Sequence, residues 1–293
     1  MQALWMVLAS FFFAAMSVCV KFAATHFNTF ELVCYRGAIG TLIMVMVCQR
    51  KNISLQTPVL KMHVIRSIAG VVSLAAWFYA IAKLPLATAM TLNYTSSVWV
   101  AAFLVGSTMW IGTFKSAARQ VPVAMTVLLG FVGVVMTLRP SFEQNQFAAG
   151  IIGVVSGMVS AIAYLQVAAL GKVGEPVERT VFYFSLGSAV AGALCMRIWG
   201  TSEWVWTLAL WLLPVGILAV LGQWCMTQAY NDGATLVVAN LQYSGIVFSA
   251  VFGLFLFGDE IPWMGWAGIG VIVLSGIAAT AFRQRSVGHI PAQ

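Results

Sequence analysis

The stretch AIAKLPLATAMTLNYTSSVWVAAF at residues 80–103 has a counterpart at residues 229–252, AYNDGATLVVANLQYSGIVFSAVF, which begins 149 positions later. Both copies hold a tyrosine in the same register, Tyr94 and Tyr243, among matched apolar residues. Matches of alanine or valine arise often by chance between apolar helices, so matched polar positions are stronger evidence for a repeat. These pair Thr91 with Asn240, Asn93 with Gln242, and Thr95 with Ser244. The chain therefore contains an internal repeat.

The composition indicates that most of the protein surface faces lipid. Hydrophobic residues make up 61% of the 293-residue chain and charged residues 8%, whereas a soluble domain has roughly half and a quarter. A membrane-spanning helix needs about 20 apolar residues. Ten stretches meet that need, so we expect an all-α integral membrane protein with ten transmembrane helices. The expected spans are 3–22, 30–48, 64–82, 86–106, 121–138, 148–170, 180–198, 206–229, 234–257 and 263–282.

The number of spans in each repeat predicts how the repeats sit in the membrane. Each repeat holds five spans, an odd number, so the two copies enter the membrane in opposite directions. We therefore expect two inverted five-helix repeats, the first over residues 1–140 and the second over residues 141–293, including a short cytoplasmic tail. Inverted repeats commonly hold a substrate near the membrane midplane and work by alternating access.

The positive charge of the chain, +7 overall, is distributed as a topology signal. With a cytoplasmic N-terminus, ten Lys and Arg residues fall on the cytoplasmic side, Arg66 among them, and four on the outer side. Arg36 is then the one charge clearly inside a span. We therefore expect a multi-pass inner-membrane protein with both termini cytoplasmic and an uncleaved first span, surrounded by lipid and without a nucleic-acid partner.

Four stretches carry a family resemblance. They are ELVCYRGAIG (31–40), FYAIAKLPLATAMTLNYTSSVWVAAF (78–103), GFVGVVMTLRP (130–140) and FLFGDEIPWMGWAGIGVIVLSG (255–276). On these residues the chain resembles the ten-helix EamA-type branch of the drug/metabolite transporter superfamily. The resemblance implies a cavity lined by the first four spans of each repeat, with the fifth span of each at the periphery. It also implies a small-molecule solute such as an amino acid, a nucleotide-related metabolite, a cofactor or a drug.

The repeated segment supplies the first group of candidate solute-binding residues. Thr91, Tyr94 and Thr95 share one helix face by their three- and four-residue spacing, and the second copy repeats that face. Polar groups that face lipid are costly, so these faces must turn toward protein or a wet cavity. The alternative is that they serve hydrogen bonding between helices. The group comprises Thr91, Asn93, Tyr94, Thr95, Asn240, Gln242, Tyr243 and Ser244.

Aromatic and amide side chains of other spans form the second group of candidates. Aromatic rings can hold the apolar part of a ligand while amides orient its polar end. The alternatives are tryptophans at the membrane interface and small residues that serve helix packing. The group comprises Trp77, Tyr79, Gln223, Trp224, Thr227 and Gln228, with Ser17 of the first span and Tyr164 of the sixth.

Arg36 needs a partner or contact with water, because it is charged and lies within the second span. One interpretation is a structural ion pair, or a side chain that reaches toward the membrane surface; Glu31 lies five residues earlier. The other interpretation is that Arg36 binds a carboxylate or phosphate of the solute, which makes it a further candidate binding residue.

Glycines in the fifth and tenth spans favour close contacts between helices. A seam within the bundle or a homodimer contact would explain them. The residues are Gly130, Gly133, Gly265, Gly268, Gly270 and Gly276.

The placement of acidic residues weighs against multidrug export. No Asp or Glu lies near the centre of an expected span, whereas antiport of a lipophilic cation usually needs such a carboxylate. We therefore favour a secondary transporter that exports a neutral, zwitterionic or amphipathic metabolite, amino-acid-like, by alternating access. The alternative is an importer or exchanger of a cofactor- or nucleotide-related metabolite.

An integral-membrane enzyme is the contrasting class of protein. Such an enzyme would need a nucleophile, a base or metal ligands gathered at the membrane. His26, His63 and His289 are scattered over expected loops and the tail, and no metal-binding or paired-carboxylate motif occurs. We therefore expect no catalysis, no cofactor and no metal.

Overall fold

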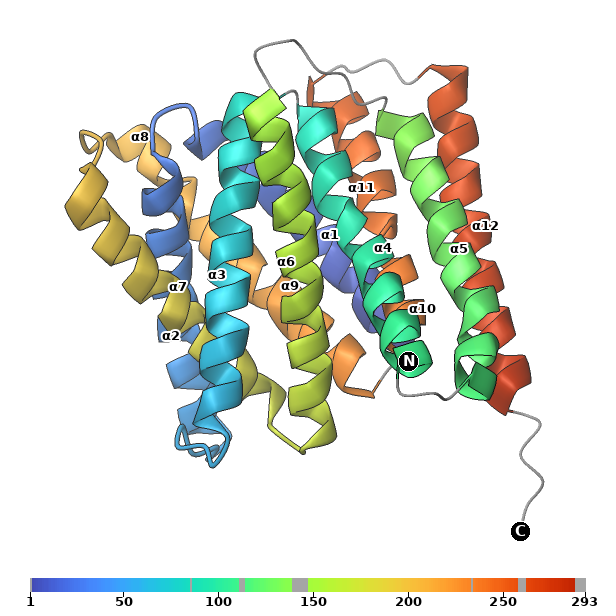
Figure 1. Ribbon diagram of the computed structural model, residues 1–293. Helices are drawn as coiled ribbons and strands as arrows, with labels where there is room; N and C mark the ends of the chain where they lie inside the picture. The colour runs from blue at the N-terminus through green and yellow to red at the C-terminus, as the bar shows by residue number, and fades with distance from the viewer. Residues whose placement is uncertain are drawn as a thin grey trace.

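The computed structural model describes residues 2–84, 86–110, 114–138, 147–232, 234–257 and 262–287, and these residues are almost wholly helical (Figure 1). Within them, nine stretches are long and apolar enough to cross a membrane. The remaining long helix, α4, has 25 residues and carries the polar residues of the repeated segment. The prediction of an all-α integral membrane fold is confirmed. The helices are α1 (Gln2–Ala23), α2 (Thr29–Arg50), α3 (Leu60–Lys83), α4 (Leu86–Trp110), α5 (Phe114–Leu138), α6 (Phe147–Lys172), α7 (Val177–Trp199), α8 (Trp206–Ala209), α9 (Leu212–Asp232), α10 (Thr235–Leu241), α11 (Ser244–Phe252), the π-helix η2 (Gly253–Phe257) and α12 (Trp263–Val287).

The ninth expected span, residues 234–257, is not one continuous helix. It ends as α10, resumes as α11 and widens into η2. At the break, the amide of Tyr243 bonds to Asn240 O at 3.1 Å, three residues back instead of four. Hydroxyl groups of neighbouring helices bond to carbonyls there: Ser97 donates to Ala239 O at 2.7 Å and Ser10 to Gln242 O at 3.3 Å. Side chains thus compete for the backbone acceptors, which a pattern of apolar residues does not reveal.

The eighth expected span, residues 206–229, is also divided. A single turn, α8, precedes the long helix α9, which begins at Leu212. Pro214 lies in the first turn of α9 and has no N–H group to bond to the turn before it. The start of a helix tolerates a proline, because the N–H group that proline lacks would have no partner in the helix there.

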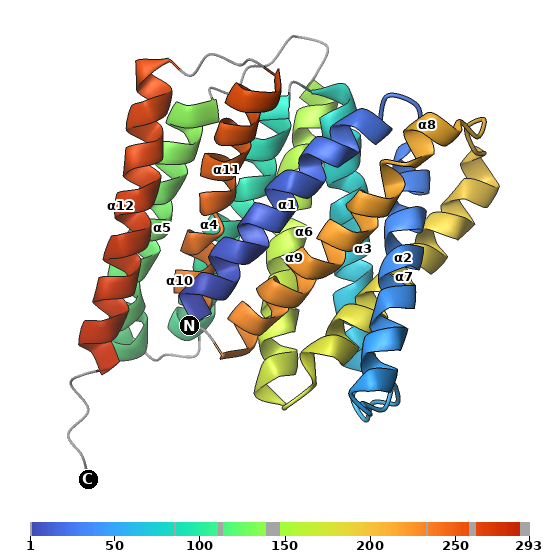
Figure 2. The same cartoon turned by 180° about the vertical axis from the view of Figure 1, so that it is seen from behind.

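Helices of one half pack against helices of the other half. α2 packs on α7, α5 on α12, α1 on α9 and α3 on α6 (Figures 1 and 2). Exchanging the two expected repeats converts the α1–α9 contact into the α6–α3 contact, so the packing has the symmetry that inverted repeats require. The expected boundary at residue 140 lies outside the described residues, as does the tail beyond residue 287, so the exact division remains a prediction.

Glycines let the backbones of paired helices approach closely. A Cβ atom on Gly133 of α5 would lie 2.7 Å from the carbonyl oxygen of Gly268 in α12. A Cβ atom on Gly37 of α2 would overlap the backbone nitrogen of Ala189 in α7. Gly133 and Gly268 therefore form a seam within the bundle, as small residues do in membrane proteins. A homodimer contact remains a prediction.

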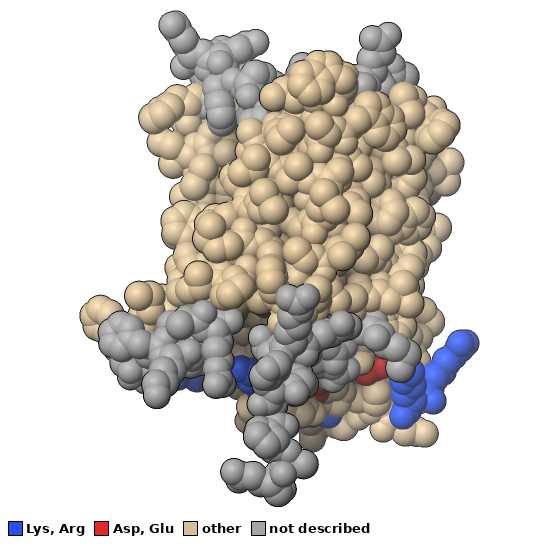
Figure 3. Space-filling model, turned by 90° about the vertical axis from the view of Figure 1, so that its right-hand side faces the viewer, with Lys and Arg blue, Asp and Glu red and all other residues tan. Residues whose placement is uncertain are grey.

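The outer surface of the bundle is apolar. Large side chains such as those of Trp263, Leu274 and Leu194 are 79%, 64% and 63% exposed. Figure 3 shows one face of the molecule, on which the described charged residues gather toward the lower end and a broad band above them holds none. α1 begins and α12 ends at this same end (Figures 1 and 2). Such a band suits the hydrocarbon core of a membrane.

Two glycines of α12 provide a matched test of the seam. Gly268→Ala should lower the free energy of unfolding by about 1–3 kcal/mol, because its Cβ would lie 2.6 Å from Gly133 O. Gly270→Ala has nothing within 4 Å of its Cβ and should leave stability unchanged or raise it by up to about 1 kcal/mol. Thermal unfolding of the purified variants in detergent measures both. Equal melting temperatures for the two variants would contradict the seam.

Candidate functional site

A cavity of about 90 Å³ lies between the helices of the two halves. Its lining residues come from eight places in the fold, and in the described chain none comes from α5 or α12. α5 and α12, side by side at the right of Figure 1, therefore support the bundle without lining the cavity. The lining residues are Ser10, Phe13, Ala14, Met16 and Ser17 of α1, Arg36 of α2, Arg66, Gly70, Ser73, Leu74 and Trp77 of α3, Met90, Asn93 and Tyr94 of α4, Ser160, Ala163 and Tyr164 of α6, Phe184 of α7, Gln223 and Met226 of α9, and Gln242 at the α10–α11 break.

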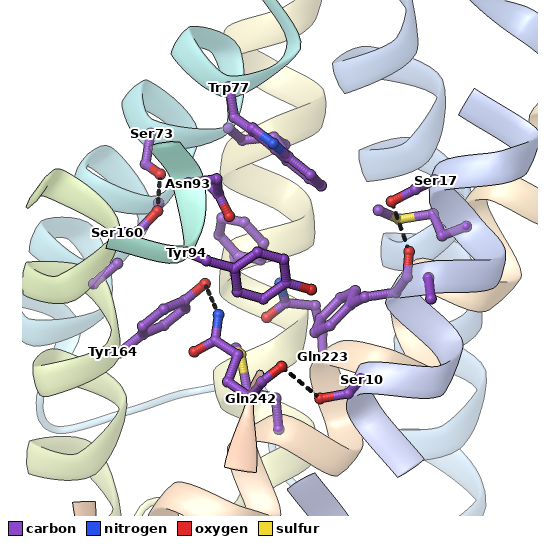
Figure 4. Close-up of a pocket in the computed structure, with 18 of the residues that line it drawn as sticks. Ser10, Ser17, Ser73, Trp77, Asn93, Tyr94, Ser160, Tyr164, Gln223 and Gln242 are labelled. Atoms are coloured by element: carbon purple, nitrogen blue, oxygen red, sulfur yellow. Dashed lines mark hydrogen bonds between the residues drawn. The ribbon is translucent and has the colours of Figure 1, made fainter. Parts of the chain in front are cut away.

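Aromatic rings form a large part of the cavity wall. Figure 4 shows the ring of Tyr94 in the middle of the site, with Trp77 above it and Tyr164 below. Tyr164 also stacks on Tyr230 with ring centroids 5.6 Å apart, which fixes its ring from behind. These rings present flat apolar surfaces to anything held in the cavity, and the indole N–H of Trp77 has no hydrogen-bond partner among the described residues.

Gln242 reaches the cavity from the break between α10 and α11. Its amide nitrogen donates to the hydroxyl oxygen of Tyr164 at 3.2 Å, and its backbone carbonyl accepts from Ser10 at 3.3 Å (Figure 4). Its side-chain oxygen is buried and has no partner in the described chain. The break thus aims an unused hydrogen-bond acceptor at the cavity.

Serines join α3 to α6 along another wall of the cavity. The hydroxyl of Ser73 contacts that of Ser160, and Ser156 donates to the backbone carbonyl of Ser73 at 3.0 Å. Asn93 of α4 donates to the hydroxyl of Ser156 at 3.4 Å. These bonds hold three helices together, so they satisfy polar groups that lipid could not.

The structure places two arginines in the cavity wall, Arg36 and Arg66, which are 5% and 2% exposed. The sequence interpretation counted Arg66 among the charges at the cytoplasmic ends of the spans and Arg36 as the one charge clearly inside a span, whereas the structure places both inside the bundle. α3 begins at Leu60 rather than Val64, so Arg66 lies almost two turns inside the helix. Its Nη2 atom donates to Gln223 Oε1 at 3.2 Å.

Arg36 does not pair with Glu31. The Glu31 carboxylate caps α2 by accepting from the backbone of Asn28 at 2.7 Å, and it also accepts from Ser202. The ion pairs of the described chain join Lys51 to Glu178, and His63 and Arg179 to Glu175, so none involves Arg36 or Arg66. A structural ion pair for Arg36 is therefore absent from this part of the chain.

Glu175 anchors a separate polar cluster between the α2–α3 and α6–α7 loops. It accepts hydrogen bonds from Thr57 at 2.8 Å and from Arg179 at 3.1 Å, and its carboxylate lies 3.2 Å from His63 Nε2. Burial alone would raise the pKa of Glu175, but these hydrogen bonds and the charge of Arg179 outweigh burial and hold the pKa below its ordinary value. The cluster ties the two loops together at one end of the bundle.

The cavity brings together eight of the residues expected to bind solute: Ser17, Arg36, Trp77, Asn93, Tyr94, Tyr164, Gln223 and Gln242. The others lie elsewhere. Asn240 donates to Thr126 of α5 at 3.1 Å and accepts from Ser275 of α12, so it joins the outer helices. Tyr243 is fully buried against the α5 glycine Gly130.

The remaining expected residues occupy helix contacts or outer positions. Thr95 and Ser244 bond to carbonyls of their own chain segments three residues back. Trp224 packs edge-on against Trp5 and donates to Glu178 at 3.4 Å. Tyr79 is 40% exposed. Outside the cavity wall also lie Thr91, Thr227 and Gln228.

Sequence reasoning missed Arg66 and the ring beside it, Phe184. A signal for Arg66 was present, because residues 66, 70, 73 and 77 follow the spacing of one helix face. That face carries Arg66, Gly70, Ser73 and Trp77, all of which line the cavity. Phe184 carried no such signal, since a phenylalanine in an apolar helix is ordinary.

A bundle of paired inverted helices with an enclosed polar and aromatic cavity defines a class of protein, the multi-pass membrane transporters. Residues 1–139 match the EamA-like transporter family. The chain is 31% identical over 260 residues to the pseudopaline exporter CntI of Pseudomonas aeruginosa, covering 87% of each protein. The chain belongs to the EamA-like transporter family of the drug/metabolite transporter superfamily, and it is a membrane transporter rather than an enzyme.

Two further comparisons agree with this family. The chain is 26% identical over 280 residues to a riboflavin transporter of Vibrio cholerae, covering 93% of this chain and 90% of that protein. A solved crystal structure superposes with a TM-score of 0.78 at 17% identity and covers 97% of this chain and 98% of its own. The latter likeness concerns the fold alone.

The two equivalent tyrosines should respond differently to the same substitution. Tyr94→Leu should reduce solute uptake by about tenfold, because the ring lies in the cavity and its loss removes stacking area. Tyr243→Leu should instead lower the free energy of unfolding by about 2 kcal/mol or more, since that ring is fully buried. Uptake in liposomes and thermal unfolding measure the two effects. Wild-type uptake in Tyr94→Leu would remove Tyr94 from the site.

Proposed function

We propose that this protein is a secondary transporter that exports a small, amphipathic, amino-acid-like metabolite across the inner membrane by alternating access. Its N- and C-termini are cytoplasmic in this proposal. The observation that carries it is the cavity between the halves, which residues from both expected repeats line. A site shared by two inverted repeats can open to either side of the membrane as the halves rock against each other.

The chemistry of the cavity wall favours a solute with apolar and polar parts. Trp77, Tyr94 and Tyr164 offer aromatic faces, while Asn93, Gln223 and Gln242 offer amides. A small number of polar groups in an otherwise apolar site is enough to orient a bound solute. The lining residues include no Asp or Glu, so the wall lacks the carboxylate that would hold a lipophilic cation.

The helix break supports a carrier mechanism. Discontinuous helices at the repeat interface commonly form the solute site of secondary transporters. Here the break lies at Gln242, which lines the cavity and bonds to Tyr164 of α6. A change in the angle between α10 and α11 would therefore move a solute-binding group directly.

The relatives support export and leave a second candidate. The likeness to a protein named a pseudopaline exporter favours outward movement of a metabolite. The likeness to a riboflavin transporter favours the alternative, an importer or exchanger of a cofactor-related metabolite. A carrier that works by alternating access follows the gradient it is given, so the solute has to be identified first.

Reconstituted transport tests this function. Purified protein is first screened by thermal shift against amino acids, their N-substituted derivatives, vitamins, nucleosides and lipophilic cations, because a bound solute stabilises the folded state. The compound that stabilises most is then used, labelled, in counterflow with liposomes that contain the protein. We expect counterflow of an amino-acid-like compound. If only vitamins stabilise the protein and show counterflow, the result would favour the importer or exchanger of a cofactor-related metabolite. If only lipophilic cations do so, the result would contradict the proposal.

Two tryptophans provide a matched test of the cavity as the solute site. Trp77→Leu should reduce counterflow by about tenfold, equivalent to about 1.4 kcal/mol, because Trp77 lines the cavity. Trp263→Leu, at a side chain of α12 that is 79% exposed, should transport at the wild-type rate. Initial rates at equal protein content measure both variants. Equal rates for the two would place the solute elsewhere.

A further inference from the structure

Two guanidinium groups lie against one aromatic ring at the edge of the cavity. The Cζ atom of Arg66 is 4.1 Å from the centroid of the Phe184 ring, and that of Arg36 is 5.3 Å from the same centroid. Phe184 belongs to α7, Arg36 to α2 and Arg66 to α3, so three helices converge here. All three residues line the cavity.

Three of the six guanidinium nitrogens of this pair are buried without an acceptor in the described chain. The Nε atom of Arg36 and the Nε and Nη1 atoms of Arg66 are buried without a partner. The Nη2 atom of Arg66 donates to Gln223, a bond that orients the guanidinium without neutralising its charge. Buried donors without acceptors are rare in native proteins and usually indicate a missing ligand, ion or water.

Gly70 makes room for this arrangement. A Cβ atom on Gly70 would overlap Arg66 Nη1 and lie 2.6 Å from the ring of Phe184. The absence of a side chain one turn after Arg66 therefore lets the guanidinium fold back along α3 onto the ring. The gap at Gly70 therefore fixes the position of the Arg66 guanidinium in the cavity wall.

Two positive charges in the membrane interior require compensation. Removing an unpaired ion from water into a medium of low dielectric constant costs several kcal/mol even after relaxation, and intramembrane arginines are normally paired. The described residues supply no carboxylate within ion-pair distance of either arginine. Cation–π contact with Phe184 offsets only part of that cost.

Other residues of the cavity lining offer the complementary chemistry. Gln242 presents a buried side-chain oxygen without a partner in the described chain, which can accept a hydrogen bond from a ligand amine. The faces of Tyr94 and Trp77 lie in the same cavity (Figure 4) and attract a cation. The lining thus combines two positively charged donor groups with a free acceptor and aromatic faces.

We infer that Arg36 and Arg66 form a subsite for two carboxylates, and that the solute is an amino dicarboxylate whose amine faces Gln242 and the aromatic rings. The inference rests on the proposed function and specifies its substrate class. Each carboxylate accepts hydrogen bonds from one guanidinium, in the geometry that arginine favours for this group. Two carboxylates balance the two arginines, so the charge that remains when the solute is bound is that of its ammonium group.

A graded series of ligands tests the subsite. N-benzylglutamic acid carries two carboxylates, N-benzylglutamine one, and N-benzylglutamine amide none, while the amine and the ring are the same. We expect the dicarboxylate to bind wild-type protein about tenfold or more tighter than the monocarboxylate, and the diamide to bind weakest. Isothermal titration calorimetry of the full-length protein in detergent measures the three dissociation constants. Equal binding of all three would overturn the inference.

Arginine variants locate the effect. Arg36→Gln and Arg66→Gln should each remove about tenfold of the preference for the dicarboxylate, and Gly70→Ala should act like Arg66→Gln. Arg50→Gln is the control, because it removes the same charge from the exposed end of α2 and should keep the wild-type preference. Should a glutamine variant fail to fold, Arg36→Lys and Arg66→Lys keep the charge and should retain part of the preference. Undiminished preference in all cavity variants would overturn the inference.

Two further readouts distinguish a carboxylate subsite from a structural role of Arg36 and from a phosphate site. Without ligand, Arg36→Gln should melt at the same temperature as wild type or higher, because an unpaired buried charge has been removed. A lower melting temperature with unchanged preference would mean that Arg36 is structural. Tighter binding of N-benzylphosphoserine than of the dicarboxylate would assign the subsite to phosphate.

Counterflow separates failure of the subsite from failure of the proposed function. Counterflow of the dicarboxylate, the monocarboxylate and the diamide at one rate would leave the transport function standing and reject the dicarboxylate as the solute class. No counterflow of any compound would reject the transport function.

Discussion

Every polar group within the hydrocarbon core must find its partner inside the protein, and this constraint organises the whole molecule. It places apolar side chains such as Leu194 and Leu274 on the outside and turns the serines of α3 and α6 toward each other. It also separates two kinds of polar group. Ser73, Ser156 and Asn240 are satisfied by neighbouring helices and hold the bundle together. In the cavity wall, Nε of Arg36 and Nε and Nη1 of Arg66 have no acceptor among the described residues.

Much of the fold could be predicted, because helices that cross lipid appear in the sequence as long apolar stretches. Residues 64–82 and 148–170 read as apolar spans and lie within the helices α3 and α6. The break at residues 242–243 could not be predicted, because it depends on hydroxyls of Ser10 and Ser97, far away in the chain, that bond to its carbonyls. The start of α3 was predicted at Val64 instead of Leu60, because Lys61 and His63 interrupt the apolar pattern.

The site was predictable where a residue's chemistry and its helix face agree. Tyr94 and Asn93 are polar members of an apolar span and line the cavity. Their equivalents in the second repeat diverge, because α10 and α11 meet at a break that α4 does not have: Gln242 reaches the cavity while Tyr243 is buried against Gly130. Internal similarity of sequence therefore indicated the repeated helices correctly but not which side chains of the second copy face the centre.

The asymmetry of the cavity follows from the same divergence. At the offset of 149 residues that relates the repeats, the position of Arg66 is occupied by Val215 and that of Arg36 by Ser185, so only the first repeat carries charge at these places. The second repeat contributes the ring of Phe184 and the amides of Gln223 and Gln242. Pseudo-symmetric helix packing gives the bundle two equivalent ways to open. The departures from symmetry at the centre give it one cavity whose halves differ in chemistry, because both arginines come from helices of the first repeat and Phe184, Gln223 and Gln242 come from the second.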